Sequence, residues 1–523
     1  MSVSLTYLTF VTQDSRAMWF SAPLFVIGLL AVALPFVQAL TASRSAMLRT
    51  VITTDMEQDD LASLIRYLLY TNELDTQGII YTSSRYHWAG DGNGTKFFIP
   101  DREYNTSQWT WRWTGTRTIQ DKVLKAYAEV YPNLHCHDPF YPTPEDLLSK
   151  VKIGNIDFEG EMDHDTGGSN LIRSLLLDKD SRPLYLQAWG GTNTIARALK
   201  SIEEKYSGSG HWSQIKNSVS RKAVIMASGF QDKAYDDYIA LNWPQVRVEN
   251  LEVGYKTWGY NCDKGHGNVR GLPAQNEYFT GTWMKAHIQA GPYGKLYRSW
   301  LDGQSMPGDQ NDIFGDPAKA NSSSTFCKPL ESYSFLSEGD NVSFNPLLMT
   351  GIQDPTNRSL GGWGGRSTKN VTSQNLWNLV DSEKSNNGSE IDNYTTDRWI
   401  SAIQNDFAAR MQWTLTPDYA DGNHAPSVKI LNGTIKAHPG STVRLAGAVS
   451  DPDSDKVTTS WWQFFEEGTY PGSVTVTEES NHRATVKIPD DAKSGQSLSI
   501  ILEGTDDGHF PLTRYGRVFI HVI

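Results

Sequence analysis

At 523 residues the chain is too long for one ordinary domain, so two or three domains are expected. Its composition, 39% hydrophobic and 20% charged, is that of a folded protein. The net charge of −12 argues against a nucleic-acid partner, because phosphate binding needs clustered Lys and Arg and the chain has no long basic run.

The N-terminal segment has the layout of a signal peptide, which we assign to residues 1–42. Arg16 precedes an apolar stretch from Met18 to Val37, and small residues follow it. A stretch of this length also suits an uncleaved membrane anchor, but Pro23 and Pro35 interrupt it and favour cleavage. No second candidate for a membrane span is found. We therefore expect a secreted protein with no stable membrane association once the signal peptide is removed.

Glycosylation sequons and cysteines agree with a secretory route. Three cysteines are too few and too scattered for a zinc site, and they predict one disulfide, Cys262 with Cys327, with Cys136 left over. Five sequons crowd into residues 321–387, which predicts surface loops there. The nine acceptors are Asn93, Asn105, Asn321, Asn341, Asn357, Asn370, Asn387, Asn393 and Asn432.

From residue 48 onward short β runs alternate with amphipathic helices. Arg49 to Thr54 predicts a buried strand, and apolar residues from Leu61 to Leu69 follow with helical spacing. Strand, helix and strand in this order predict an α/β fold with a mainly parallel sheet and flanking helices. The active site of such a sheet lies beyond the carboxyl ends of its strands. Further strands are predicted at residues 78–82, 184–188, 223–226 and 246–253.

The composition of the second half of the chain changes twice. Residues 301–395 are rich in Gly, Asn, Ser and Asp, which predicts long loops framing a site, and a helix is predicted at 397–413. After a linker at 418–426, short β runs separated by turn signals are typical of an immunoglobulin-like β-sandwich. We therefore expect a first domain over residues 43–418 and a sandwich over 424–523. The β runs fall at residues 427–431, 442–445, 473–477, 484–488, 498–503 and 515–522.

One turn of the predicted sandwich is acidic. Asp451-Pro452-Asp453-Ser454-Asp455 places three carboxylates close together in sequence. Such a turn can hold a calcium ion between its carboxylates, or it can simply be solvated, and the sequence does not decide between the two.

The strongest chemical signal is the run from Thr54 to Asp60, between the first strand and the first helix. Asp59 and Asp60 at a helix start are stabilising on dipole grounds alone. A helix cap does not require Asp55, which stands at the strand end. Three carboxylates that converge there repel one another unless a cation neutralises them, and oxygen-only ligands select a hard ion such as Ca²⁺. A calcium site is therefore favoured over simple capping.

The D-x-x-x-D-D pattern of this loop resembles the calcium-binding signature of nucleoside hydrolases. The wider run from Thr54 to Trp88 resembles a secreted branch of that superfamily, cellulose-binding proteins with a nucleoside-hydrolase-like domain. The likeness covers nearly all of the mature chain, including the sandwich. It also rests on the runs at residues 165–169, 182–194, 337–340, 361–366, 461–470 and 498–517.

The resemblance implies a calcium site and a hydrolytic mechanism. Asp55, Asp60, the backbone carbonyl of Trp189 and the carboxylate of Asp340 would ligate the ion. Asp59 would hold sugar hydroxyls. Calcium would activate a water, Asp55 would accept its proton, and the water would attack the anomeric carbon through an oxocarbenium-like transition state.

Two departures from the family pattern bear on the leaving group. Nucleoside hydrolases carry a Gly inside the aspartate loop, where this chain has Glu57, and a His beside the late aspartate that protonates the leaving base. Here Gly339 stands beside Asp340, which leaves Glu338 as the nearest candidate general acid. An O-linked sugar is therefore a more credible leaving group than a base.

We assign further residues to substrate binding because they lie in or near the sequence runs that resemble the family. The alternative is core packing for His87 and for any single Trp, and a solvated or braced loop for Asp165 and Arg366. The set consists of His87, Asp165, Asn193, Trp363 and Arg366, together with Asp59.

The favoured function is a secreted, calcium-dependent hydrolase of glycosidic bonds in cell-wall or polysaccharide-derived sugars. The alternatives are a non-catalytic cellulose- or carbohydrate-binding protein and a true nucleoside N-ribohydrolase. The intact set of Asp55, Asp59 and Asp60 favours catalysis, whereas the missing His favours binding. The sequence decides neither the sugar nor whether the chain forms a homo-oligomer.

Overall fold

The structure of the chain, a computed structural model, describes residues 46–260, 272–322, 327, 331–373, 375–384, 389–479 and 482–523. The predicted signal peptide and Cys262 lie outside the described residues. Cys327 is disulfide-bonded, and Cys136 is a free, exposed thiol. None of the described helices is long and apolar enough to cross a membrane.

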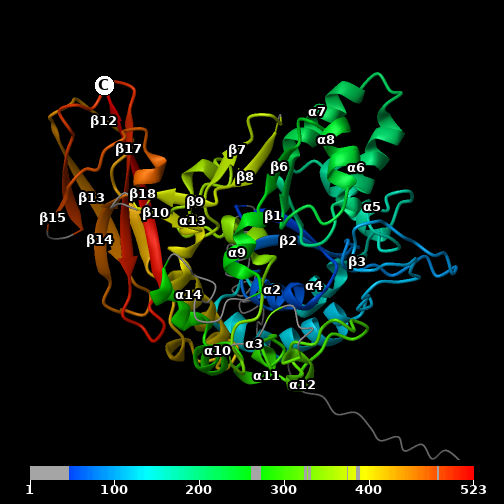
Figure 1. Cartoon of the computed structure of the whole chain (residues 1–523). Coiled ribbons are helices and arrows are strands. Elements are labelled where there is room, and N and C mark those ends of the chain that lie inside the picture. Colours follow the sequence, from blue (N-terminus) through cyan, green and yellow to red (C-terminus); the bar gives the residue numbers. More distant parts are fainter. Residues whose placement is uncertain are drawn as a thin grey trace, which may run out of the picture. The chain divides into compact units, whose positions relative to one another are not determined.

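An eight-stranded sheet forms the centre of the first part of the chain (Figure 1). Its strands are β1 (Leu48–Thr54), β2 (Leu74–Tyr81), β3 (Val151–Ile153), β4 (Leu184–Ala188), β5 (Ala223–Ala227), β6 (Arg247–Asn250), β7 (Ser367–Lys369) and β8 (Leu376–Leu379). Their spatial order is β3-β2-β1-β4-β5-β6-β8-β7. Every neighbouring pair is parallel except β7 with β8 at the edge. The predicted mainly parallel α/β sheet is confirmed.

The chain reverses its direction across this sheet between β1 and β4. From β1 it proceeds outward through β2 and β3, and then it returns to β4 and proceeds the other way through β5 and β6. At such a reversal the loops that leave the two central strands diverge and open a crevice at their carboxyl ends. The two loops are the aspartate loop after β1 and the Trp189-Gly190-Gly191 turn after β4.

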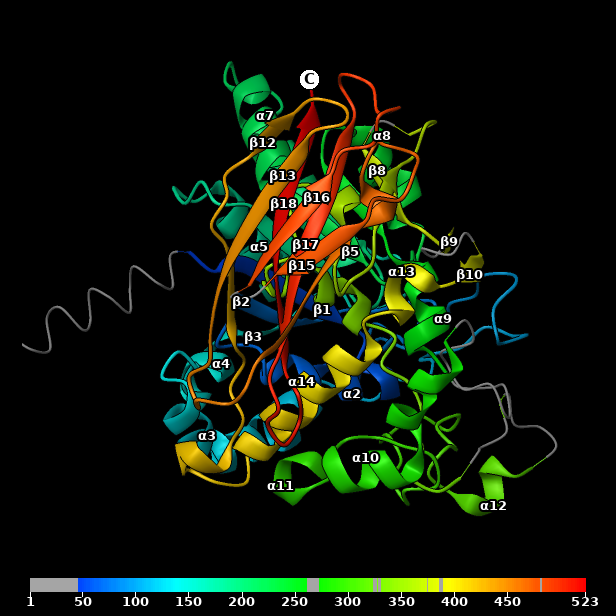
Figure 2. The ribbon, with the colours of Figure 1, turned by 90° about the vertical axis from the view of Figure 1, so that its left-hand side faces the viewer.

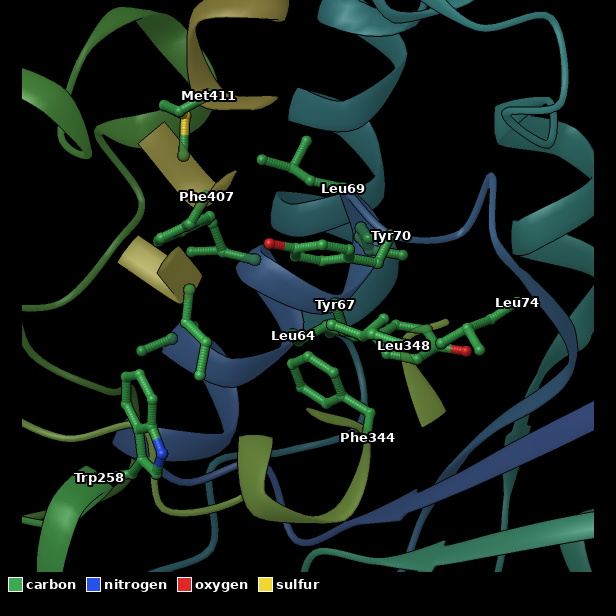
Figure 3. Packing of buried hydrophobic residues seen from close by; sticks show 14 of the residues in the cluster. Leu64, Tyr67, Leu69, Tyr70, Leu74, Trp258, Phe344, Leu348, Phe407 and Met411 are labelled. Atoms are coloured by element: carbon green, nitrogen blue, oxygen red, sulfur yellow. The ribbon is translucent and has the colours of Figure 1, made fainter. Parts of the chain in front are cut away.

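Helices cover both faces of the sheet. Successive residues of β1 point to opposite faces, so Ile52 belongs to one core and Val51 to the other. Figure 3 shows the first core, where Tyr67 packs edge-on against Phe344 at 5.4 Å between ring centroids. The helices are α2 (Gln58–Leu68), α3 (Leu124–His137), α4 (Pro144–Lys150), α5 (Gly167–Leu177), α6 (Asn193–Tyr206), α7 (Trp212–Lys222), α8 (Ala240–Asn242), α9 (Tyr255–Trp258), α10 (Gly281–His287), α11 (Gly291–Gly294), α12 (Pro317–Ala320), α13 (Tyr394–Asp397) and α14 (Ile400–Trp413).

Two four-stranded sheets form the C-terminal part, which confirms the predicted β-sandwich. Alternate residues such as Leu445, Val486 and Ile500 fill the space between the sheets. Two of the strands, β12 and β14, were not predicted, because one is short and the other contains a Trp-Trp pair. The sheets are β11 (Ser427–Ile430), β13 (Thr442–Ser450), β16 (Arg483–Lys487) and β15 (Val476–Glu479), and β12 (Ile435–Ala437), β18 (Thr513–Val522), β17 (Ser497–Thr505) and β14 (Thr458–Gln463).

The sandwich is held against the first part of the chain mainly along β18. The Tyr515 amide donates to the Thr350 carbonyl at 2.9 Å, and a guanidinium nitrogen of Arg517 donates to the Ile352 carbonyl at 2.7 Å. Beside them, Arg514 forms an ion pair of 2.8 Å with Asp406 of α14. Figure 2 looks onto the sandwich, whose long strands β17 and β18 run towards α14.

Some predictions for residues 301–395 and their surroundings were wrong. This region is not only loop, because β8 adds to the sheet in parallel with β6 and β7 follows it at the edge. A hairpin of β9 (Ser382–Lys384) and β10 (Glu390–Asp392) lies there too. Two of the sequons are not surface acceptors, since Asn341 and Asn393 are 0% and 6% exposed.

Replacing Gly351 with Ala is expected to lower the unfolding midpoint in urea. A Cβ at this position would lie 1.8 Å from the carbonyl oxygen of Tyr515, and the φ of +98° is strained for any other residue. A strain of this kind costs on the order of 1–3 kcal/mol. Gly433→Ala is the control, because nothing lies within 4 Å of a Cβ there. Equal midpoints for the two variants would contradict the close approach of β18.

Candidate functional site

The aspartate loop leaves β1 through a strained turn at Met56. Its φ of +55° lies in the left-handed region, which costs a residue with a side chain roughly 1–2 kcal/mol. Two hydroxyls hold the turn: the Met56 amide donates to Thr54 Oγ1 at 3.0 Å, and Thr114 Oγ1 donates to the Met56 carbonyl at 3.0 Å. The family's Gly was expected at Glu57, but the left-handed residue is Met56. This turn places Asp55 and Glu57 around the same crevice.

Asp59 and Asp60 lie in the first turn of α2. Asp60 does cap the helix, since its Oδ2 accepts from the Glu57 amide at 3.2 Å, and its Oδ1 accepts from the Thr54 hydroxyl. Helix capping alone does not explain this group of carboxylates, because a third one, Asp340, comes from a loop far along the chain. Oxygen atoms of Asp59, Asp60 and Asp340 lie within 4.8 Å of one another, and all three residues are buried.

Burial, followed by the charges of the neighbouring carboxylates, raises the pKa of Asp59, Asp60 and Asp340 well above the ordinary aspartate value. Without a counter-charge these groups would therefore hold protons rather than carry three negative charges. A cation held beside these carboxylates would offset the repulsion and favour their charged form. The all-oxygen donor set fits a hard ion such as Ca²⁺.

Asp55 is buried; its Oδ2 lies 3.4 Å from Nδ1 of His87, and its Oδ1 accepts no hydrogen bond from the described residues. A buried carboxylate oxygen without a donor is costly, so Oδ1 points to a group that the protein itself does not supply. Gly190, in the turn after β4, makes room for it, because a Cβ there would lie 3.0 Å from Asp55 Cβ. The carbonyl of Trp189 precedes this glycine and accepts from Gln231 Nε2 at 2.7 Å. The loops after β1 and β4 therefore meet at Asp55.

A cavity of about 790 Å³ opens over these carboxylates. Its volume suits a ligand of several sugar rings or one nucleoside. The wall combines carboxylates, two guanidinium groups and five aromatic rings, a mixture that suits a ligand with hydroxyls and apolar ring faces. The lining includes Glu57, Asp59, Asp60, Asp340, Glu103, Glu252, Arg85, Arg112, Tyr86, Phe230, Tyr255, Tyr260 and Phe314.

Behind the aspartate loop, His87 is fully buried among carboxylates. Its Nδ1 lies 3.0 Å from Glu57 Oε2 and 3.4 Å from Asp55 Oδ2, and its Nε2 lies 3.5 Å from Asp309 Oδ2. Burial alone would lower the pKa of His87, but Glu57, Asp309 and Asp55 outweigh it and raise that pKa well above the ordinary histidine value. His87 therefore acts as an imidazolium that holds Asp55 and Glu57 in place.

No sequence pattern indicated the residues that complete this network. Arg112 pairs with Asp309 at 3.0 Å, and Tyr260 donates to Glu57 Oε1 at 3.2 Å. All three come from loops far along the chain from the aspartate loop. No local motif marks them, so only the fold shows that they lie beside Glu57.

Glu338 does not reach the cavity, which removes the reason for its assignment as a general acid. It is fully buried and binds Arg66 through both oxygens, at 2.5 and 2.8 Å. Tyr297 and Asn341 also donate to it. Its carboxylate is therefore the counter-ion of a buried arginine.

The structure also places four predicted substrate residues away from the cavity lining. Asp165 is exposed and pairs with Arg173 and Arg197. Asn193 braces three loops, donating to Ser83 Oγ and to the carbonyls of Asn155 and Glu161. Trp363 is buried in the first core, with Arg514 of the sandwich above its ring. Arg366 pairs with Glu383 at 2.5 Å.

Glu338→Gln is expected to destabilise the fold, because it leaves the guanidinium of Arg66 buried without a counter-charge. Breaking a buried pair in this way costs about 3–5 kcal/mol, which urea unfolding measures. Glu252→Gln is the control, since Glu252 lines the cavity and no described residue forms an ion pair with it. If Glu338→Gln were as stable as the control and merely inactive, the structural role given to Glu338 would be wrong.

Calcium is expected to raise the melting temperature more at about pH 8 than at about pH 5. The pKa values of Asp59, Asp60 and Asp340 are higher in the folded than in the unfolded chain. Without a cation they therefore cost stability as the pH rises above the ordinary aspartate value. A cation offsets this cost only where the groups are deprotonated.

The measurement compares chelated and calcium-loaded protein at both pH values. Asp60→Asn, which removes one ligand charge, should shrink the calcium effect at the higher pH. A calcium effect that does not change with pH would contradict the proposed ligand set.

Residues 49–367 match the family described as cellulose-binding Sde182, nucleoside hydrolase-like domain, and residues 442–522 match the C-terminal domain of cellulose-binding protein Sde0182. A nucleoside hydrolase-related hypothetical protein from Saccharophagus degradans, described as associated with carbohydrate metabolism, is 26% identical with a TM-score of 0.65, covering 91% of this chain and 100% of that chain.

Among other solved structures, the plant nucleoside hydrolase PpNRh1 is 9% identical with a TM-score of 0.32, covering 70% of this chain and 98% of that chain. No curated protein matches the chain. With the family match spanning more than half of its length, the chain belongs to the cellulose-binding Sde182 family with a nucleoside hydrolase-like domain.

Proposed function

We propose that this protein is a secreted, calcium-dependent hydrolase that acts on a glycosidic bond of a carbohydrate. One observation carries the proposal: the buried carboxylates of Asp59, Asp60 and Asp340 converge at one cavity, and no described cationic side chain is bound directly to them. A chain that only folds has no use for such a costly arrangement.

The residues have distinct roles in this proposal. Asp55, Asp60, Asp340 and the carbonyl of Trp189 would hold calcium, and Asp59 would accept hydrogen bonds from sugar hydroxyls. Calcium held there supplies Lewis-acid chemistry, lowering the pKa of a water that it ligates. Asp55 would accept the proton of the attacking water at Oδ1, which has no donor among the described residues, while His87 faces Oδ2. The carboxylates around the anomeric carbon stabilise the positive charge of an oxocarbenium-like transition state.

The leaving group would depart with little help from a side-chain acid. Glu338 is committed to Arg66, and His87 is held behind the aspartate loop. Burial and the charges of Asp59 and Glu57 raise the pKa of Tyr255 and Tyr260 well above the ordinary tyrosine value, so these hydroxyls hold their protons too tightly for an efficient acid. Tyr255 remains able to donate a hydrogen bond to a ligand, whereas the Tyr260 hydroxyl donates to Glu57.

This shortage of an acid favours a second candidate, a carbohydrate-binding protein that uses the cation without turnover. The family description, cellulose-binding, points the same way. In both cases the partner is a carbohydrate, and the place of action is outside the cell. The predicted division into residues 43–418 and 424–523 would then give a site domain and a sandwich that packs against it.

The mature chain and its Asp55→Asn and Asp60→Asn variants should be tested against plant and fungal oligosaccharides, insoluble cellulose, inosine and uridine. Hydrolysis by the unchanged chain should fall about 10²- to 10⁴-fold in Asp55→Asn, because the proton acceptor is lost. Chelation should abolish it, and calcium should restore it. Asp490→Asn, an exposed residue of the sandwich with 80% of its side chain accessible, is the control.

Two other results would redirect the proposal. Calcium-dependent binding of carbohydrate with no product from any substrate would favour the binding protein over the hydrolase. Cleavage of inosine or uridine alone would make the chain a nucleoside hydrolase and contradict the assignment to carbohydrate.

A further inference from the structure

A second group of buried oxygens lies at one end of the sandwich, apart from the cavity. Three segments meet there: Asn423 of the linker that follows α14, the turn Asp451–Asp455 between β13 and β14, and the loop Asp506–Leu512 between β17 and β18. The Lys456 amide donates to Asp507 Oδ1 at 2.9 Å, and Asn423 Nδ2 donates to Asp506 Oδ1 at 2.9 Å. These bonds bring the three segments together.

Asp451 and Asp506 each use one carboxylate oxygen to hold the backbone of their own loop. Asp451 Oδ1 accepts from the amides of Asp453 and Asp455, at 2.8 and 3.0 Å. Asp506 Oδ1 accepts from the amides of Gly508 and Leu512, at 3.1 and 3.0 Å. The loops are thus complete with one oxygen of each carboxylate.

The other oxygens are left without a partner. Asp451 Oδ2, Asp506 Oδ2 and Asn423 Oδ1 are sealed from solvent and accept no hydrogen bond from any described residue. Asp506 and Asn423 are only 3% and 6% exposed. Buried oxygens without donors are rare and costly, so three of them in adjoining segments point to a missing cation.

The charge around these oxygens is almost wholly negative. Ligand atoms of Asp451, Asp453 and Asp455 lie within 4.8 Å of one another. His424 is engaged with Asp453 at 3.0 Å, and no described Lys or Arg forms an ion pair with Asp451, Asp455 or Asp506. A helix end or a solvated turn does not explain carboxylates that are also shielded from water.

We propose that Asp451, Asp506 and Asn423 form a calcium site that fastens the linker to the sandwich. Carboxylate and amide oxygens are the ligands that Ca²⁺ prefers, and Asp455, whose carboxylate lies within 4.8 Å of that of Asp451, completes the carboxylate set. The site involves none of the cavity residues, so it is independent of the proposed hydrolase.

The position of the site gives it a mechanical role. Trp413 of α14 donates from its indole nitrogen to the Asn423 carbonyl at 3.0 Å, and the His424 amide donates to Asp453 Oδ2 at 2.6 Å. A cation on Asn423 and Asp506 therefore connects the last helix of the first domain to two loops of the sandwich. Removing it should loosen the linker without disturbing the cavity.

The test uses the mature chain and the variants Asp451→Asn, Asp506→Asn and Asp60→Asn, with Asp490→Asn as a same-domain control. Asparagine keeps the oxygen that accepts the backbone amides and replaces only the free oxygen, so the loops should still fold. Calcium is supplied at millimolar levels, because weak carboxylate sites have dissociation constants of roughly 10⁻⁴ to 10⁻³ M. Bound calcium, the melting temperature and protease cleavage in the linker are measured.

The unchanged chain should hold about one calcium more than Asp451→Asn or Asp506→Asn, and these two variants should lose the calcium-dependent protection of the linker. Asp60→Asn should weaken binding at the cavity and keep the linker protection, which separates the two sites. Equal calcium content and equal linker protection in the unchanged chain and in Asp451→Asn would overturn the proposal.

If Asp451→Asn and Asp506→Asn failed to fold, the proposal would be tested with Asp60→Asn, whose sandwich is unchanged. No calcium-dependent protection of its linker would then overturn the site. Protection that titrates with calcium would support it.

Discussion

Mutual repulsion between buried carboxylates is the constraint around which the centre of this protein is arranged. Asp55, Asp59 and Asp60 reach the carboxyl end of β1 through a turn at Met56 that is strained in itself. Asp340 joins them from a distant loop, and Gly339 allows this, because a Cβ there would lie 2.5 Å from Asp59 Oδ2. Such groups can remain charged together only if a cation offsets their repulsion, so the proposed metal site and the fold of this crevice are linked.

The reversal of strand order between β1 and β4 explains why the carboxylates gather here. Loops that leave the two strands in opposite directions create the crevice, and Gly190 brings the turn after β4 against Asp55. His87, Glu57 and Asp309 then form a charged support behind the loop. None of the described sandwich residues lines the cavity. The oxygens of Asp451 and Asp506 in the sandwich and of Asn423 in the linker belong to the separate site that we propose fastens the linker.

The sequence was sufficient for the strand-and-helix alternation, the sandwich and the aspartate loop, because each has a strong local pattern. It could not show that β8 enters the sheet, since Leu376–Leu379 is a short run among polar residues. It also misplaced Glu338: beside Asp340 in sequence, its side chain points instead to Arg66, whose position only the packing of α2 decides. Asp309, Arg112 and Tyr260 were missed because their proximity to Glu57 depends on long loops without a motif.

Anomalous diffraction from crystals of the mature chain grown with calcium tests the central claim most directly. We expect a calcium peak in the crevice after β1, at about 2.3–2.6 Å from carboxylate oxygens of Asp60 and Asp340. It should vanish in crystals of Asp60→Asn grown under the same conditions. Ordered carboxylates that share hydrogen bonds with one another, with no metal between them at neutral pH, would contradict the claim, because protons rather than a cation would then relieve their repulsion.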